Sequence, residues 1–177
     1  HFVVAGHTYG SSQEPNMGLY PKFLKRYLQL KSPVDFLVLT GDFVRRCHEQ
    51  SWQLAMEDLA RLQTPFHIAL GNHDNSDYCR EQHAKKYGGN HYSFERDDNL
   101  FVVLDSQEAP RSISERQIHF LEDVLKKSTA KRVFVFFHEV LWIGNYSPYR
   151  QVRGNSRSRY HELALSNYWA EIHPLFK

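Results

Sequence analysis

The sequence predicts an α/β domain with a mostly parallel sheet, and three observations favour that fold class. Short runs rich in Val, Phe, Leu and Ile recur along the chain and are bounded by polar or turn residues, as buried strands are. Between them lie segments whose apolar residues repeat at helical spacing. Strands and helices that alternate in this way build a sheet of mostly parallel strands. No internal repeat or linker interrupts the pattern, so we expect a single domain over residues 1–177.

The expected elements cover most of the chain. Strands are predicted at Phe2–Ala5, Phe36–Thr40, Phe66–Leu70, Leu100–Asp105 and Val133–Phe137. Helices are predicted around Leu19–Leu28, Trp52–Leu62 and Ile118–Leu125. The third helix begins at Ser114, and Gln117 three residues later predicts a capping box. The run His91–Glu95 is expected to form a hairpin with the strand that begins at Leu100, which makes the predicted sheet mixed.

Composition and charge narrow the classes of function. The 177 residues are 41% hydrophobic and 24% charged, which is typical of a folded domain and excludes a disordered chain. The formal net charge of only +2 disfavours a nucleic acid or an anionic membrane as the partner. Every apolar run is shorter than the ~20 residues that span a bilayer. We therefore expect a soluble domain without a transmembrane segment.

The ends of the chain and its cysteines leave the compartment open. The chain begins at His1 without an initiator Met, so the natural N-terminus is expected to be missing, and the domain could be cytoplasmic or exported. Cys47 and Cys79 lack the spacing of a zinc motif and allow at most one disulfide. The sequence predicts no particular oligomeric state.

Polar motifs follow four of the predicted strands. They are Gly6-His7-Thr8-Tyr9-Gly10, Gly41-Asp42, Gly71-Asn72-His73-Asp74 and His138-Glu139. Open α/β sheets bind ligands where the carboxyl ends of their strands meet. Carboxylate, amide oxygen and imidazole groups are ligands for Mn, Fe or Zn. With 11 histidines in the chain, these motifs together predict a metal site at the sheet edge.

The order of these motifs resembles that of the calcineurin-like metallophosphoesterase superfamily, whose pattern runs D-x-H, G-D, G-N-H-[DE], H and G-H-x-H. The Gly-Asn-His-Asp element is the most specific match. The resemblance implies a four-layer α/β/β/α sandwich of mixed sheets with a two-metal site at one edge. No G-H-x-H follows in this chain, so the domain is expected to stop short of its natural C-terminus.

The resemblance also implies roles for individual residues. Asp42 would bridge two metal ions, and Asn72 and His138 would bind the second of them. His73 would donate a proton to the leaving group, with Asp74 orienting its imidazole. Such a pair of ions, which could be Mn, Fe or Zn, activates water and neutralises the charge of a phosphoryl transfer.

The first motif departs from the family pattern. His7 stands where the family has Asp, and Tyr9 stands where it has His. Two alternatives stay open at this point. His7 and Tyr9 form a modified first metal site, or that half-site is lost and a single ion, or none, remains. Tyr9 could equally pack over the site as an aromatic side chain.

Arginines provide the candidate contacts to the substrate. Arg45 follows Asp42 closely, and Arg150 and Arg153 belong to an arginine-rich segment at 146–160 that is expected to form an exposed loop over the site. The favoured function is metal-dependent hydrolysis of a small phosphomonoester or phosphodiester. The alternative is a catalytically weakened relative that binds a phosphorylated ligand or a protein partner, and the charge balance counts against a nuclease.

Overall fold

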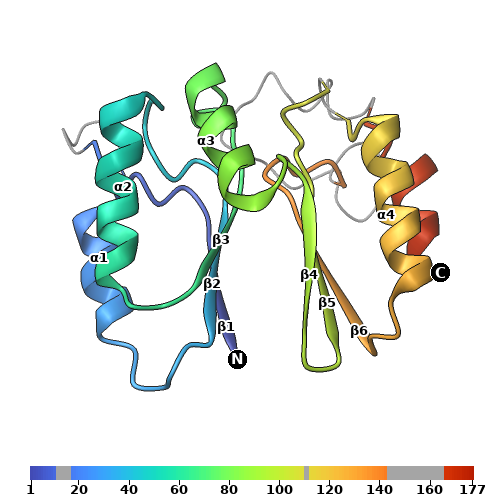
Figure 1. The fold of residues 1–177 in the computed structure, drawn as a ribbon, viewed down its shortest axis with the longest axis horizontal. Coiled ribbons are helices and arrows are strands. Elements are labelled where there is room, and N and C mark those ends of the chain that lie inside the picture. The colour runs from blue at the N-terminus through green and yellow to red at the C-terminus, as the bar shows by residue number, and fades with distance from the viewer. Residues whose placement is uncertain (11–16, 110–111, 143–165) are drawn as a thin grey trace.

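The computed structural model describes residues 1–10, 17–109, 112–142 and 166–177 (Figure 1). The strands are β1 (Phe2–Ala5), β2 (Phe36–Thr40), β3 (Phe66–Ala69), β4 (Tyr92–Arg96), β5 (Asn99–Val103) and β6 (Arg132–Phe136). The helices are α1 (Pro21–Leu28), α2 (Glu49–Arg61), α3 (Asp77–Tyr87) and α4 (Glu115–Lys127), with short helical turns η1 (Tyr168–Ile172) and η2 (His173–Phe176). Within these ranges, no helix combines the length and the apolar character that crossing a membrane requires.

The strands form two sheets of three strands each. In the first sheet β1, β2 and β3 lie side by side and run parallel. In the second sheet β4 and β5 form an antiparallel hairpin, and β6 pairs in parallel with the other side of β5. The α/β class, the predicted hairpin and the mixed strand directions are thus confirmed.

The two sheets pack face to face between layers of helix. Figure 1 shows α1 and α2 on one side of β1–β3, and α4 with the C-terminal turns on the far side of β4–β6. Among the described residues, three apolar clusters lie between the sheets and the helices. Phe36 and Val38 of β2 pack against Phe101 and Val103 of β5 between the sheets. The outer face of the first sheet packs on α1 and α2, and that of the second packs on α4 and η1.

Helix α3 is absent from the sequence-based expectations. Its buried side chains include Cys79 and His83 rather than aliphatic residues, so the apolar periodicity that predicts a helix is missing. The helix begins after Ser76, whose side chain accepts a hydrogen bond from the Cys79 N–H, and ends at Gly88 in the left-handed conformation. In Figure 1 it lies above β3 and β4, at the edge where the strands of the first sheet end.

The predicted capping box at Ser114 is wrong. Ser114 does precede α4, but its side chain accepts no backbone N–H. The Gln117 side chain, which would accept the Ser114 N–H in a capping box, is instead bonded to the main-chain N–H and C=O of Asp105. A capping box forms at α2, where the side chains of His48 and Ser51 each accept the other residue's backbone N–H. The tertiary contact of Gln117 with the end of β5 outweighs its local capping role.

His67 of β3 is packed among aromatic rings. Its imidazole stacks on Phe94 at a centroid distance of 3.7 Å and lies beside Tyr87 and Tyr92. Within the described part of the chain, its buried Nδ1 atom has no hydrogen-bond partner. Burial among these rings lowers the pKa of His67 to about 4, and the Lys86 charge acts in the same direction.

We expect His67 to make the protein less stable in mild acid. Because its pKa is about 4 in the folded state and about 6.5 when unfolded, its stabilising contribution is complete above pH 6.5 and is lost as the pH falls towards 4. Between pH 7.5 and 5 this loss amounts to about 1 kcal/mol, after discounting for partial exposure. Urea unfolding at both pH values, of the natural protein and of His67→Phe, measures this loss in the free energy of unfolding. Equal losses in the two proteins would contradict the assignment.

Candidate metal centre

Three side chains from both sheets converge at the carboxyl ends of their strands. His7 follows β1, Asp42 follows β2 and His138 follows β6, and one ligand atom from each lies within 4.8 Å of the other two. The Asp42 carboxylate lies between the imidazoles, with Oδ2 3.4 Å from His7 Nε2 and Oδ1 3.5 Å from His138 Nε2. The side chains of Asp42 and His138 are only 3% and 7% exposed, whereas that of His7 is 58% exposed, so the cluster is open on the His7 side.

The backbone around Asp42 has an unusual conformation that brings these groups together. His7 and Asp42 have φ values of 52° and 55°, in the left-handed region that few residues other than glycine adopt. Gly41 has a φ of 88°, and a Cβ atom there would lie 2.3 Å from His138 Nδ1. A Cβ atom at Gly71 would lie 2.3 Å from an Asp42 carboxylate oxygen. Both glycines are therefore required by the close approach of the ligand side chains.

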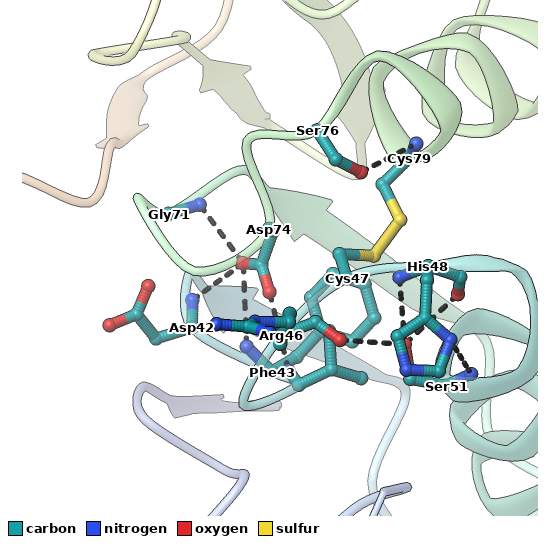
Figure 2. The surroundings of a disulfide bond; sticks show 11 residues. Asp42, Phe43, Arg46, Cys47, His48, Ser51, Gly71, Asp74, Ser76 and Cys79 are labelled. Atoms are coloured by element: carbon teal, nitrogen blue, oxygen red, sulfur yellow. Dashed lines mark hydrogen bonds between the residues drawn. A yellow bond between two sulfur atoms is a disulfide. The ribbon is translucent and has the colours of Figure 1, made fainter.

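Asp74 holds the two central loops together from beneath. Its fully buried carboxylate accepts hydrogen bonds from the backbone N–H groups of Asp42, Phe43, Val44 and Gly71 (Figure 2). Burial and the nearby Asp42 charge raise the pKa of this carboxyl, and three of the N–H donors lower it. That Asp74 orients the His73 imidazole stays a prediction, because the contacts found for this carboxylate among the described residues are with backbone N–H groups.

His73 lies beside the cluster and has partners of its own. Its Nδ1 atom is 2.5 Å from the Arg45 carbonyl oxygen, and its backbone N–H donates to Asp42 Oδ1 at 3.0 Å. The Tyr9 ring stacks on the imidazole at a centroid distance of 5.0 Å. Since a carbonyl oxygen can only accept, the Nδ1 atom carries the hydrogen, and Nε2 is left as the atom that can exchange a proton.

The donor set around His138 fits a cation. His138 Nδ1 donates to the Thr40 carbonyl at 2.9 Å, so the Nε2 atom of the neutral imidazole presents a lone pair. That atom faces Asp42 Oδ1 at 3.5 Å and Asn72 Oδ1 at 3.3 Å. Three acceptor atoms that face one another repel unless a cation lies among them. Imidazole, carboxylate and amide oxygen together match the preferences of Mn, Fe and Zn, and the carbonyl that orients His138 is the usual support of a metal-binding imidazole.

The surroundings of His7 and Tyr9 favour the uncharged imidazole and the uncharged phenol. Burial lowers the pKa of His7, and the neighbouring His138 and His73 lower it further, while Asp42 acts in the opposite direction. A neutral imidazole is the form that binds a metal ion. Burial and the Asp42 charge raise the pKa of Tyr9, so its phenol keeps its proton in the metal-free protein.

A family model described as calcineurin-like phosphoesterase matches residues 7–168, which include every candidate metal ligand described above. The chain belongs to the calcineurin-like phosphoesterase family. This confirms the resemblance that the motifs indicated. A probable glycerophosphodiester phosphodiesterase GpdQ of Arcobacter nitrofigilis is 30% identical to this calcineurin-like chain over 117 residues. The match covers 62% of the chain and 43% of that relative's length.

The calcineurin-like fold brings most of the predicted site residues into one place. His7, Tyr9, Asp42, Asn72, His73 and His138 all lie at this edge, with Asp74 directly below. The carbonyl oxygen of Arg45 accepts the hydrogen bond from His73 Nδ1. The Arg45 side chain is exposed, and its positive charge acts to lower the pKa of the Tyr9 phenol. Arg150 and Arg153, with the whole segment 146–160 for which a loop was predicted, lie outside the described residues.

Other contributors to the site were missed by the sequence reasoning. They are the carbonyl groups of Thr40 and Arg45, which orient the two imidazoles, and the role of Gly41 and Gly71, which were named only as parts of motifs and which leave room for ligand side chains. The role of the glycines could have been found, because each directly precedes a candidate ligand at a strand end. A carbonyl contact gives no signal in the sequence, since every residue carries that group.

Proposed function

We propose that this chain is a metal-dependent phosphoesterase that hydrolyses a small phosphodiester. The observation that carries the proposal is the convergence of His7, Asp42 and His138 at the edge where the two sheets meet. Membership of the calcineurin-like phosphoesterase family supports phosphoester hydrolysis, and the similarity to a probable glycerophosphodiester phosphodiesterase favours a diester over a monoester. We also propose that residues 1–177 form one domain with the four-layer α/β/β/α arrangement.

We propose that the cluster holds two metal ions with Asp42 between them. The two oxygens of its carboxylate face different partners, since Oδ2 faces His7 and Oδ1 faces His138. His7 would serve the first ion, and Asn72 and His138 the second. When bound, such ions lower the pKa of a water molecule and neutralise negative charge on the phosphoryl group. Mn, Fe and Zn all suit this donor set.

His73 is proposed as the proton donor to the leaving group. The Arg45 carbonyl holds the hydrogen on Nδ1, which leaves Nε2 to carry the proton that is transferred. Tyr9 is proposed to support this imidazole by stacking on it, rather than to bind metal, because its phenol has a raised pKa in the metal-free protein. Asp74 supports the same arrangement from below through the loop that carries Asp42.

Metal removal and restoration test the proposed function. The purified protein is stripped with a chelator and supplied separately with Mn²⁺, Fe²⁺ or Zn²⁺, and turnover of bis-p-nitrophenyl phosphate and p-nitrophenyl phosphate is followed together with bound metal. We expect turnover only with metal present, and a higher kcat/KM for the diester. Stoichiometric metal binding without turnover of either compound would favour the binding-only alternative. Absence of both metal binding and turnover would refute the proposal.

A further inference from the structure

A disulfide links the loop that carries Asp42 to the helix that follows the Asn72-His73-Asp74 loop. Cys47 lies in the loop after β2 that also carries Asp42, and Cys79 lies in the first turn of α3, just after the Asn72-His73-Asp74 loop. The Cα atoms of the two cysteines are 6.2 Å apart. Cys79 is fully buried and Cys47 is 6% exposed, within the core that Phe43 and Val44 also enter. The crosslink therefore lies in the interior directly below the site loops.

Apart from the disulfide, hydrogen bonds join the same two loops. The Cys47 N–H donates to the His73 carbonyl at 3.1 Å, and the His73 side chain meets the Arg45 carbonyl. The Asp74 carboxylate collects three N–H groups from the loop after β2. Figure 2 shows the disulfide on the other side of Asp74 from the Asp42 carboxylate. Hydrogen bonds thus join the two loops directly, and the disulfide adds a covalent link from the Asp42 loop to the helix that begins just after the other loop.

The residues that these loops present must be held closely in place. Asp42 and Asn72 belong to different loops, yet both face His138 Nε2 within 3.5 Å. The first loop connects β2 to α2 and the second connects β3 to α3. Neither contains a helix or a strand. A displacement of about 1 Å at such a site can cost about 100-fold in rate. A covalent link from the Asp42 loop to the first turn of α3, directly after the second loop, limits that displacement better than hydrogen bonds, which exchange with water.

We propose that the Cys47–Cys79 disulfide is a positioning element of the metal centre, which fixes the Asp42 loop against the Asn72-His73 loop. This inference rests on the proposed function, because it assigns the crosslink to the same site. Opening the disulfide loosens the ligand set and the proton donor together while the sheets stay folded. The chain then functions best in an oxidising compartment, where disulfides persist.

The double variant Cys47→Ala/Cys79→Ala tests the proposal through three readouts. In the metal-free protein, amide hydrogen exchange at Phe43, Val44 and Cys47 is expected to be at least tenfold faster, because their acceptors lie across the joined loops. Zn²⁺ affinity is expected to fall at least tenfold, measured by competition with a chromogenic chelator. The kcat for bis-p-nitrophenyl phosphate should fall by a similar factor, with KM changed less than threefold.

A matched control separates positioning from general stability. Leu59→Ala removes a buried side chain that belongs to α2 and to neither loop, from the same core. It should lower Tm while Zn²⁺ affinity and loop exchange stay as in the natural protein. Cys47→Val/Cys79→Ala, which fills more of the vacated volume, serves if the first double variant does not fold.

A folded double variant with unchanged Zn²⁺ affinity and loop exchange would overturn the proposal, even if its Tm were lower. Equal loss of Zn²⁺ affinity in Leu59→Ala would also overturn it, because general destabilisation would then explain the effect. Failure of the proposed function looks different, since the natural protein itself would then show neither bound metal nor turnover.

Discussion

Replacing Asp42 with Asn is expected to reduce metal-dependent turnover of bis-p-nitrophenyl phosphate by about 1000-fold or more. The variant loses the negative charge that lies between His7 Nε2 and His138 Nε2. A bound metal ion stabilises the transition state by several kcal/mol. A loss of about 4 kcal/mol of this stabilisation lowers the rate by a factor of about 1000. The measurement is kcat/KM together with the metal content of the purified protein, which is expected to fall in parallel.

The fold of this variant is expected to survive. Asn keeps the shape of Asp and retains an oxygen to accept the His73 N–H. The Asp42 charge also raises the pKa of the buried Asp74 carboxyl, so removing that charge relieves repulsion. The metal-free variant should therefore have a Tm equal to or above that of the natural protein, and only the rise in Tm on adding Zn²⁺ should disappear.

Asp98→Asn provides the matched control for Asp42→Asn. Asp98 is an exposed carboxylate at the turn between β4 and β5, where it pairs with Lys131. Its replacement removes the same charge at the opposite end of the strands, and both turnover and the Zn²⁺-induced rise in Tm should be kept. If Asp42→Asn kept that rise in full, Asp42 would not be a metal ligand.

Replacing His73 with Ala is expected to lower turnover by about 100-fold to 10,000-fold while the metal stays bound. Loss of a general acid has effects of this size. The imidazole pairs with the Arg45 carbonyl and stacks on Tyr9 rather than joining the cluster of His7, Asp42 and His138. The His73 N–H that supports Asp42 belongs to the backbone and remains in the variant. Metal content and Zn²⁺ affinity should therefore match the natural protein.

The leaving group of the substrate gives this prediction a second measurement. A nitrophenolate leaves without much help from an acid, whereas an alkoxide needs a proton. His73→Ala should thus lose more activity towards an alkyl phosphodiester than towards bis-p-nitrophenyl phosphate. His119→Ala makes the same chemical change on the exposed face of α4 and should leave both activities intact. Loss of metal from His73→Ala to the extent seen in Asp42→Asn would show that His73 is a ligand.

Much of the fold was predictable because the strands are strongly apolar. The runs at β2 and β5 are buried almost throughout, so their positions follow from hydrophobicity alone, within one or two residues at the ends. Helix α3 was not predictable in this way, because its buried face is made of Cys79 and His83. Only the tertiary structure shows how this helix is held in place. Cys79 forms a disulfide with Cys47, and His83 is hydrogen-bonded to the Ile68 carbonyl.

The neighbourhood of the candidate residues was also predictable, but their individual geometry was not. Parallel strands end at a common edge, so motifs that follow β1, β2 and β3 must lie near one another. Nothing in the motif Gly-Asn-His-Asp distinguishes an Asp74 that orients an imidazole from one that collects backbone N–H groups, as the structure has it. The roles assigned to these residues as ligands and proton donor stay predictions for the experiments above.

By itself, the sequence determined the class of fold, the family and the set of residues from which a metal centre could be built. These depend on residue type and on order along the chain, which the motifs preserve. Only the tertiary structure decided how Asp42 divides its two oxygens between His7 and His138, which carbonyl groups orient the imidazoles, and that Cys47 and Cys79 join the loops below them. Those features depend on backbone angles and on contacts between residues far apart in sequence, which spacing along the chain does not specify.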